Sequence, residues 1–234
     1  MVTSRFQLAI EVLLPYMKKP GTIAVCTPGL SFSWLWVHSW THFLPKLMQD
    51  FYVRNCFSSG CNIYHVRNQC AAEAAKVEGG LDGLDYILWI DSDNMFSYEW
   101  FEELLGIMEA RPEVSGVGAW YLSQMNIQGN GRVAACNIKD WKDEFLTVQQ
   151  ITAAGDELIE VDCLGFGFML MRPQVLKDVG PSPFTPLIAP DGTPMSDDAG
   201  LMLKAKAFGH RFFVHPKMQA PHLKTIPLPL GMAL

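Results

Sequence analysis

Short apolar runs alternate with longer amphipathic segments along the first half of the chain. The run "TIAVC" follows Pro20-Gly21 and ends near Pro28-Gly29, which indicates a buried strand. Strands that alternate with helices are typical of an α/β domain, with an open, mostly parallel sheet and helices on both faces. The pattern predicts further strands over 50–57, 84–90 and 114–122, and helices over 31–51, 65–80 and 98–110.

The second half of the chain is less regular. Residues 121–150 include the polar stretch "SQMNIQGNGR", and we expect a mobile loop or a long turn there. Residues 157–180 predict two strands around a glycine-containing bend, followed by a short helix. A proline-rich loop over 181–194 then leads to a helix over 196–209, which ends at Gly209, and to a last strand over 210–216. No repeat or linker divides the chain, so we predict a single Rossmann-like domain over 1–234.

Composition narrows the class of protein. With 234 residues, of which 49% are hydrophobic, the chain can bury a sizeable core. The net charge of −6 gives no overall field that would attract nucleic acid or an anionic membrane surface, although a local basic groove is compatible with it. The six cysteines include no Cys-x-x-Cys pair and predict reduced thiols in a cytoplasmic protein.

Two segments bear on location and assembly. Residues 1–20 carry apolar residues at helical spacing, interrupted by Glu11, and predict a surface helix rather than a signal peptide or a transmembrane segment. The helix predicted over 31–51 is rich in tryptophan, which is typical of a core or of a subunit contact in a homo-oligomer. A wall of an acceptor-binding site is the alternative interpretation of this helix.

Two carboxylates directly follow a run of four apolar residues, in "ILWIDSDNMF". In an open α/β sheet, ligands bind beyond the carboxyl ends of the strands, where Asp91 and Asp93 are expected. Two adjacent carboxylates repel each other unless a cation lies between them, and oxygen ligands of this kind suit Mg²⁺ or Mn²⁺. The alternative is structural, with Asp91 capping the next helix and Asp93 pairing with a basic side chain.

Further candidates lie in the last third of the chain. Asp197 and Asp198 begin a predicted helix, and His222 follows 24 residues after Asp198. Carboxylates in the first turn of a helix are also ordinary complements of the helix dipole, and a single histidine is most often a packing residue. The order and spacing of the three residues are therefore more informative than each residue alone.

At this point the chain resembles the GT-A-fold glycosyltransferases that use a nucleotide-diphosphate sugar, of the family-two type. The resemblance covers roughly residues 21–224 and implies a nucleotide-binding part over about 21–120 and an acceptor- and metal-binding part over about 121–224. The matching segments, in chain order, are "IAVCTP", "HVRNQCAAEAA", "YILWIDSDNMF", "GFGFMLMRPQVL" and "SDDAGLMLKAKAFGHRFFVHP" with the closing "APH".

The resemblance also implies roles for individual residues. Asp198 matches the base that deprotonates the acceptor hydroxyl in inverting members, and Asp197 is the alternative catalytic acid of the pair. The donor-binding residues implied are Thr27, Pro28, Arg67, Asp91, Gly165 and Gly167, and the Mn²⁺ or Mg²⁺ ligands implied are Asp91, Asp93 and His222. Three of these residues have an alternative interpretation, because Arg67 is also consistent with an exposed charge at the start of a helix, and Gly165 and Gly167 with a bulge in a core strand.

The predicted function is transfer of a sugar from a nucleotide-diphosphate sugar to an acceptor hydroxyl, with inversion. The acceptor is open among a glycan, a small molecule, a protein and a hydroxymethylated base in viral DNA, the last of which would place the protein in a host cytoplasm. One rival is a haloacid-dehalogenase-like phosphatase, because Lys177 lies between the two acidic motifs. The other is a subunit that binds a sugar nucleotide without turnover.

Overall fold

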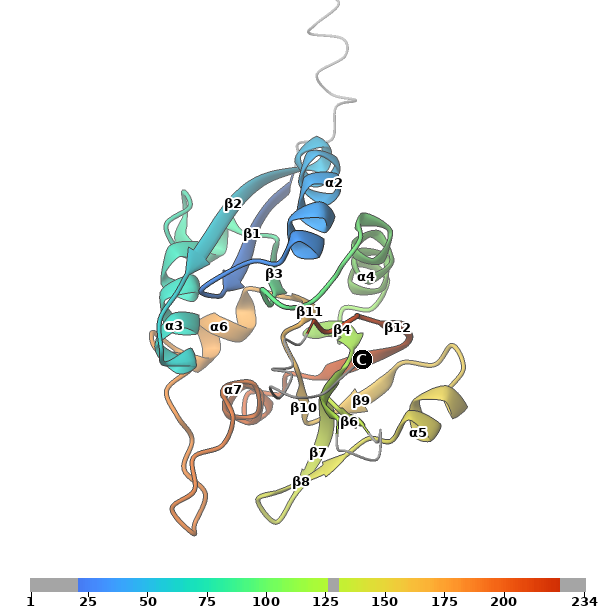
Figure 1. Ribbon diagram of the computed structural model, residues 1–234. Coiled ribbons are helices and arrows are strands. Elements are labelled where there is room, and N and C mark those ends of the chain that lie inside the picture. Colours follow the sequence, from blue (N-terminus) through green and yellow to red (C-terminus); the bar gives the residue numbers. More distant parts are fainter. Residues whose placement is uncertain (1–20, 126–130, 224–234) are drawn as a thin grey trace, which may run out of the picture.

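The apolar runs of the chain pair into one central sheet in the computed structural model, which describes residues 21–125 and 131–223 (Figure 1). The surface helix predicted over 1–20 lies outside these residues. The strands of the sheet are, in spatial order, β2 (Phe51–Ser58), β1 (Gly21–Pro28), β3 (Tyr86–Ile90), β11 (Phe168–Met171), β4 (Gly116–Trp120), β12 (Phe212–Gln219) and β9 (Ile159–Val161).

The sheet is mostly parallel, as the sequence predicts. β2, β1 and β3 pair in parallel, and so do β4 and β12. β11 lies antiparallel between β3 and β4, and β9 is antiparallel to β12 at the edge. The insertion of β11 joins a strand from the second half of the chain to two strands from the first half. Both halves therefore share one sheet.

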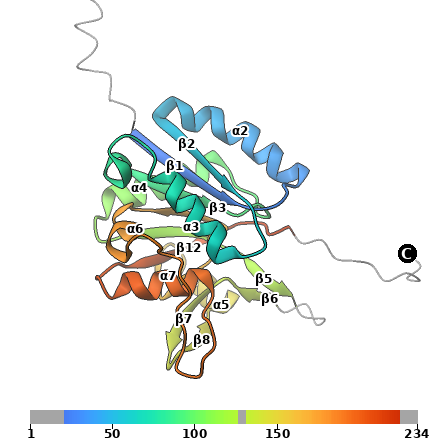
Figure 2. The same ribbon diagram turned by 90° about the vertical axis from the view of Figure 1, so that its left-hand side faces the viewer.

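Helices cover both faces of the sheet (Figures 1 and 2). Side chains of a strand alternate between its faces, so Ile23 and Val25 pack on one side while Ala24 and Cys26 pack on the other. The first face carries α2 and α4, and the second carries α3, α6 and α7. The helices are α2 (Trp34–Asp50), α3 (Ile63–Ala74), α4 (Tyr98–Ala110), α5 (Val148–Ala153), α6 (Gln174–Val179) and α7 (Asp197–Lys206), with a 3₁₀ turn, η2 (Gly80–Gly83).

The loop or long turn predicted over 121–150 is largely wrong, because the described part of this segment forms strands. β5 (Leu122–Met125) pairs with β6 (Gly131–Val133), and β7 (Ala135–Lys139) pairs with β8 (Lys142–Phe145) and with β10 (Cys163–Leu164). These strands are short and polar on their outer side. The alternation of apolar and polar residues was therefore too weak to predict them as strands. A short helix, α5, follows them.

Three further features of the structure bear on the sequence-based predictions. α7 is followed by Gly209, whose φ of +87° is the left-handed conformation that favours glycine, and this confirms the predicted end of the helix. All six cysteines are free thiols, as predicted. Within residues 21–125 and 131–223, the structure contains no helix that is long and apolar enough to span a bilayer.

Candidate functional site

An open cavity of about 480 Å³ lies where β1, β3 and β4 end. It is therefore at the edge of the sheet where the sequence placed the ligand site. Its lining includes seven of the predicted site residues, namely Pro28, Arg67, Asp91, Asp93, Asp197, Asp198 and His222. Four of these are aspartates, and Arg67 is the one described arginine or lysine that lines the cavity. The charge of the lining is thus strongly negative.

The loop after β1 forms one wall of the cavity. Pro28, Gly29 and Leu30 line it, and the N–H of Gly29 donates to the carbonyl of Ser58 at 2.9 Å. A Cβ atom on Gly29 would lie 2.3 Å from Oγ of Ser92, which stands between the two aspartates. Only a glycine therefore lets this loop approach the Asp-Ser-Asp segment so closely.

Arg67 lies on α3 and joins two of the acidic segments. Its Nη2 donates to Oδ1 of Asp91 at 2.9 Å, and its Nε donates to Oδ2 of Asp197. The guanidinium also lies over the rings of Phe166, at 4.5 Å, and Trp89, at 5.6 Å. Arg67 is 5% exposed, so this ion cluster is buried, and the alternative of an exposed charge at the start of a helix is wrong.

The electrostatics of the cluster follow from burial and from the unequal number of charges. Burial lowers the pKa of the Arg67 guanidinium, but the attraction of Asp91 and Asp197 outweighs it and leaves the pKa above its ordinary value. Burial raises the pKa of the Asp91 carboxyl despite the opposing charge of Arg67, and Asp93 and Asp197 raise it further. A single arginine thus neutralises the acidic end of the cavity only in part.

Asp93 and His222 form a second, more open pair. Nε2 of His222 lies 2.9 Å from Oδ2 of Asp93, whose side chain is 40% exposed. Backbone hydrogen bonds hold the two segments together, because Met95 N–H donates to the carbonyl of Pro221 and Leu223 N–H donates to that of Asp93, at 2.9 and 2.6 Å. The predicted ligands from the two ends of the chain therefore meet.

The hydrogen bonds of His222 define which of its ring nitrogens faces Asp93. Nδ1 lies 2.9 Å from the carbonyl oxygen of Leu122, which can only accept, so Nδ1 carries a proton and donates it. Nε2 then faces Asp93 and donates to its carboxylate when the ring carries both protons, whereas in the neutral ring the lone pair of Nε2 is available to a cation. Histidines that bind metals are commonly oriented by such a bond from the other ring nitrogen.

Asp197 and Asp198 have different surroundings in the first turn of α7. Asp197 is bound by Arg67, whereas Oδ1 of Asp198 accepts the N–H of Ala199 at 2.8 Å. Burial and the neighbouring charge of Asp197 raise the pKa of the Asp198 carboxyl. A carboxylate with a raised pKa is a stronger base, and proton transfer is more favourable to such a group.

Three of the predicted donor-binding residues are not among the described residues that line the cavity. Thr27 is buried at the end of β1, and its hydroxyl has no hydrogen-bond partner in the described part of the chain. Gly165 and Gly167 pack against Tyr121, since a Cβ atom would lie 2.2 Å from its hydroxyl at Gly165 and 2.6 Å from its ring at Gly167. The two glycines make room for this ring, and their donor-binding role stays a prediction.

Tyr121 is the clearest lining residue that sequence reasoning missed. It directly follows β4, is 7% exposed and contacts the ring of His222 edge-on at 4.8 Å between centroids. Burial raises the pKa of its phenol well above the ordinary value, so the hydroxyl is neutral. Its place near the carboxyl end of the strand predicted over 114–122 was the available signal, because residues at that edge of an α/β sheet face the ligand site.

The described residues contain no group of three or more His, Cys, Asp or Glu side chains arranged to hold a metal ion. Asp93 and His222 form a pair, whereas Asp91 is bound by Arg67. Lys177, on which the phosphatase alternative depends, pairs with Asp82 and is not among the described residues that line the cavity. The phosphatase arrangement is therefore not assembled in this cavity.

Comparison with solved structures identifies the fold. A197 from STIV matches with a TM-score of 0.52 and 15% identity, over 87% of this chain and 86% of that one. GalNAc-T7, solved with UDP, GalNAc and Mn²⁺, matches with a TM-score of 0.56 and 11% identity, over 88% of this chain and 44% of that one. The fold is GT-A-like. This chain spans less than half the length of GalNAc-T7, and comparison with protein-family models and with curated sequences gave no match.

Proposed function

We propose that the protein is a glycosyltransferase that moves a sugar from a nucleotide-diphosphate sugar to an acceptor hydroxyl, with the help of a divalent cation. The observation that carries this proposal is the cavity in a GT-A-like fold, whose described lining includes four aspartates and one arginine. An anionic diphosphate would be repelled by such a lining unless a cation accompanied it. The GT-A-like neighbour solved with UDP, GalNAc and Mn²⁺ supports the same combination.

Asp93 and His222 fit the role of cation ligands. Their facing atoms lie 2.9 Å apart, and the bond from Nδ1 to Leu122 keeps the ring oriented with Nε2 towards Asp93. Mg²⁺ and Mn²⁺ sites often use few protein ligands and complete their coordination with water and substrate phosphates. When bound, the cation would stabilise negative charge on the departing nucleoside diphosphate. The predicted participation of Asp91 would be limited by its bond to Arg67.

Arg67 would organise the donor side of the cavity. Its two ion pairs fix Asp91 and Asp197 relative to α3, while Nη1 is buried without a hydrogen-bond partner among the described residues. An unpartnered donor of this kind is costly and would be satisfied by a phosphate oxygen of the donor. The arginine would thus serve both the protein framework and the diphosphate.

Asp198 would act as the base. The acceptor oxygen forms a bond to the anomeric carbon of the sugar, the bond from that carbon to the phosphate oxygen breaks, and Asp198 takes the acceptor proton. The anomeric configuration inverts because the acceptor attacks opposite the leaving group. Asp197 is the weaker candidate, since its carboxylate is held by Arg67.

Calorimetric titration with a panel of nucleotide-diphosphate sugars tests the proposal. We expect binding of one donor in Mn²⁺ and none that is detectable after chelation, and we expect Asp93→Ala to abolish the cation-dependent part. Asp82→Asn is a matched control, because it removes an exposed carboxylate that is not among the described lining residues. Equal donor affinity with and without metal would contradict the role of the cation.

A further inference from the structure

The hairpin formed by β7 and β8 ends in an unusual turn. Lys139 pairs with Lys142, so the turn between them consists of Asp140 and Trp141. Both residues have positive φ, 50° and 64° respectively. Two-residue hairpin turns of this handedness strongly favour glycine at the second position, and a bulky side chain there is rare. The backbone therefore disfavours tryptophan at position 141.

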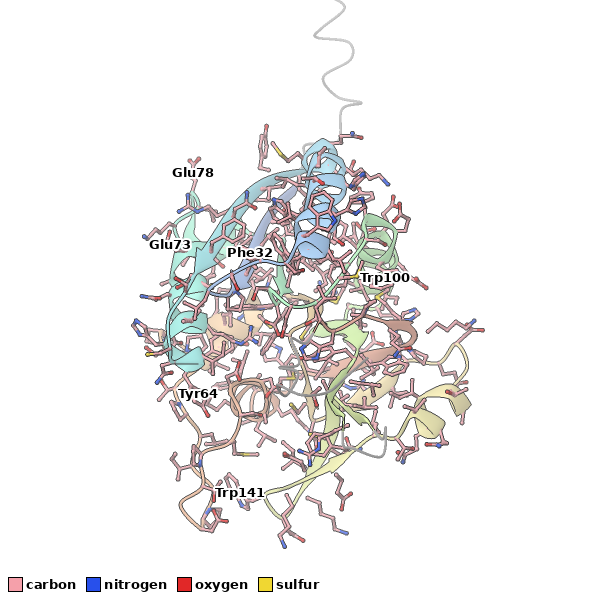
Figure 3. The ribbon with its side chains drawn as sticks, in the orientation of Figure 1. Phe32, Tyr64, Glu73, Glu78, Trp100 and Trp141 are labelled. Atoms are coloured by element: carbon pink, nitrogen blue, oxygen red, sulfur yellow. The ribbon has the colours of Figure 1, made fainter. Side chains whose placement is uncertain are left out.

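Packing does not explain the tryptophan either. The side chain of Trp141 lies at the outer end of the hairpin, where Figure 3 labels it, and the residue is 46% exposed. Burial of an aromatic ring stabilises a fold in proportion to the area removed from water, and this ring keeps much of its area in water. A strained backbone position that carries an exposed aromatic side chain is more often retained for binding than for stability.

The surroundings of the ring indicate the chemistry of its ligand. The exposed neighbours on the hairpin are polar, namely Asn137, Lys139, Asp140, Lys142, Asp143 and Glu144. A flat apolar ring among amide, amine and carboxylate groups suits a saccharide, whose C–H face packs on the indole while its hydroxyls accept and donate hydrogen bonds. A protein partner would require an apolar surrounding that excludes water, and a nucleic acid would require a predominance of basic residues.

The inner end of the same hairpin adjoins the proposed catalytic base. Cys136, near the start of β7, belongs to one buried cluster with Cys163 and Ala199, and Ala199 directly follows Asp198. From Cys136 to Lys139, the last residue before the turn that carries Trp141, the strand advances by three residues, or roughly 10 Å at the rise of an antiparallel strand. A single pyranose ring does not span this distance, whereas a short oligosaccharide does.

We propose that Trp141 is an outer subsite for a saccharide acceptor whose reactive end lies at Asp198. This inference rests on the proposed function and adds the acceptor class, which is an oligosaccharide or the end of a longer glycan. The strained turn is then the consequence of presenting the indole to a chain that extends outward from the cavity along the hairpin.

The test uses the full chain and an array of immobilised monosaccharides and their longer oligomers, together with measurement of Tm and of donor hydrolysis. We expect the wild type to bind some oligomers more tightly than the corresponding monosaccharide. Trp141→Gly should reduce this binding by about tenfold, which is the scale of one aromatic contact, and leave monosaccharide binding unchanged. Its Tm should be equal or higher, because glycine relieves the turn. Trp141→Phe should retain part of the binding.

Trp34→Ala is the matched control, because it removes another exposed tryptophan, on α2, that is not among the described lining residues. The proposal is overturned if Trp141→Gly binds every oligomer as the wild type does, if the wild type binds no saccharide, or if Trp141→Gly lowers Tm. Donor hydrolysis separates the two proposals. If the protein hydrolyses no donor but binds oligomers through Trp141, the transfer reaction is rejected and the subsite is kept. If it hydrolyses a donor but binds no oligomer, the transfer reaction is kept and the subsite is rejected.

Discussion

The cavity contains two groups of paired polar side chains that differ in their access to water. Arg67 binds both Asp91 and Asp197, and the arginine is almost fully buried. Asp93 and His222 also form a pair, but the aspartate side chain is 40% exposed. The two aspartates of one Asp-x-Asp motif thus belong to different groups. The comparison teaches that one half of such a motif can order the framework while the other half stays accessible in the cavity.

This difference has an energetic reason. A buried charge that loses its partner is left in a medium that solvates it poorly, whereas an exposed charge is taken up by water. The buried group should therefore respond to mutation mainly through stability, and the open pair mainly through ligand binding. Asp198 lies next to the buried group but is not held by Arg67. Mutation of Asp198 therefore tests whether this residue responds like the buried group or like the open pair.

The largest expected effect separates the two acids of α7. Asp198→Asn keeps the shape of the side chain and an acceptor for the N–H of Ala199, but removes the base, so transfer should fall roughly 10²–10⁴-fold while donor binding persists. Asp197→Asn should mainly reduce stability, because it removes one of the two ion pairs of the buried Arg67. Single-turnover rates and donor titrations measure both. Exchanged phenotypes would assign the base to Asp197, and a product that retains the donor's anomeric configuration would remove Asp198 from this role.

A large loss of stability is expected at the buried group. Arg67→Met leaves Asp91 and Asp197 without their partner and should cost about 3–5 kcal/mol, the usual result of breaking a buried pair. For a chain of this size that corresponds to a decrease in Tm of roughly 6–20 °C. Adding Asp91→Asn and Asp197→Asn should recover part of the loss, because no unpaired charge then remains. A triple variant as unstable as Arg67→Met would show that packing of the guanidinium, not its charge, dominates.

At the open pair, we expect a smaller effect on stability and a larger effect on the affinity for the cation. His222→Ala should weaken Mn²⁺ binding by about tenfold or more, with a Tm close to that of the wild type. Electron paramagnetic resonance of free Mn²⁺ during a titration measures the affinity, and His38→Ala on the exposed side of α2 is the matched control. A variant that melts several degrees lower with unchanged Mn²⁺ affinity would identify His222 as a packing residue.

The smallest effect concerns pH. Because burial and Asp197 raise the pKa of Asp198 in the folded state, this group favours folding most below the ordinary pKa of aspartate and progressively less as the pH rises through its raised folded pKa. Asp198→Asn removes this dependence. We therefore expect the Tm of the variant to increase relative to that of the wild type as the pH rises from below the ordinary pKa. A difference in Tm that is constant over this range would contradict the raised pKa.

The fold class was readable from the sequence because its physical basis is local. Apolar runs of strand length, separated by helical segments, can bury their surface only as a covered sheet, and this pattern alone places Asp91 at the carboxyl edge of the sheet. The glycine after α7 was equally readable from its conformational freedom. The short strands between 121 and 150 were not, since their stability comes from pairing with one another and with β10 rather than from a strong pattern of their own.

The sequence by itself determined which chemical groups the site contains, namely the acidic pairs, Arg67 and His222, because their types and order are written along the chain. Only the tertiary structure decided how these groups are divided between the buried group and the open pair. Whether Arg67 binds Asp91 or Asp93, and whether His222 reaches either, depends on contacts between residues that are 24 and 129 positions apart. No local pattern encodes such distances. The packing of α3 against β1 and β2, and of the segment after β12 against the end of β3, sets these distances. The same packing sets the partition between the buried group and the open pair.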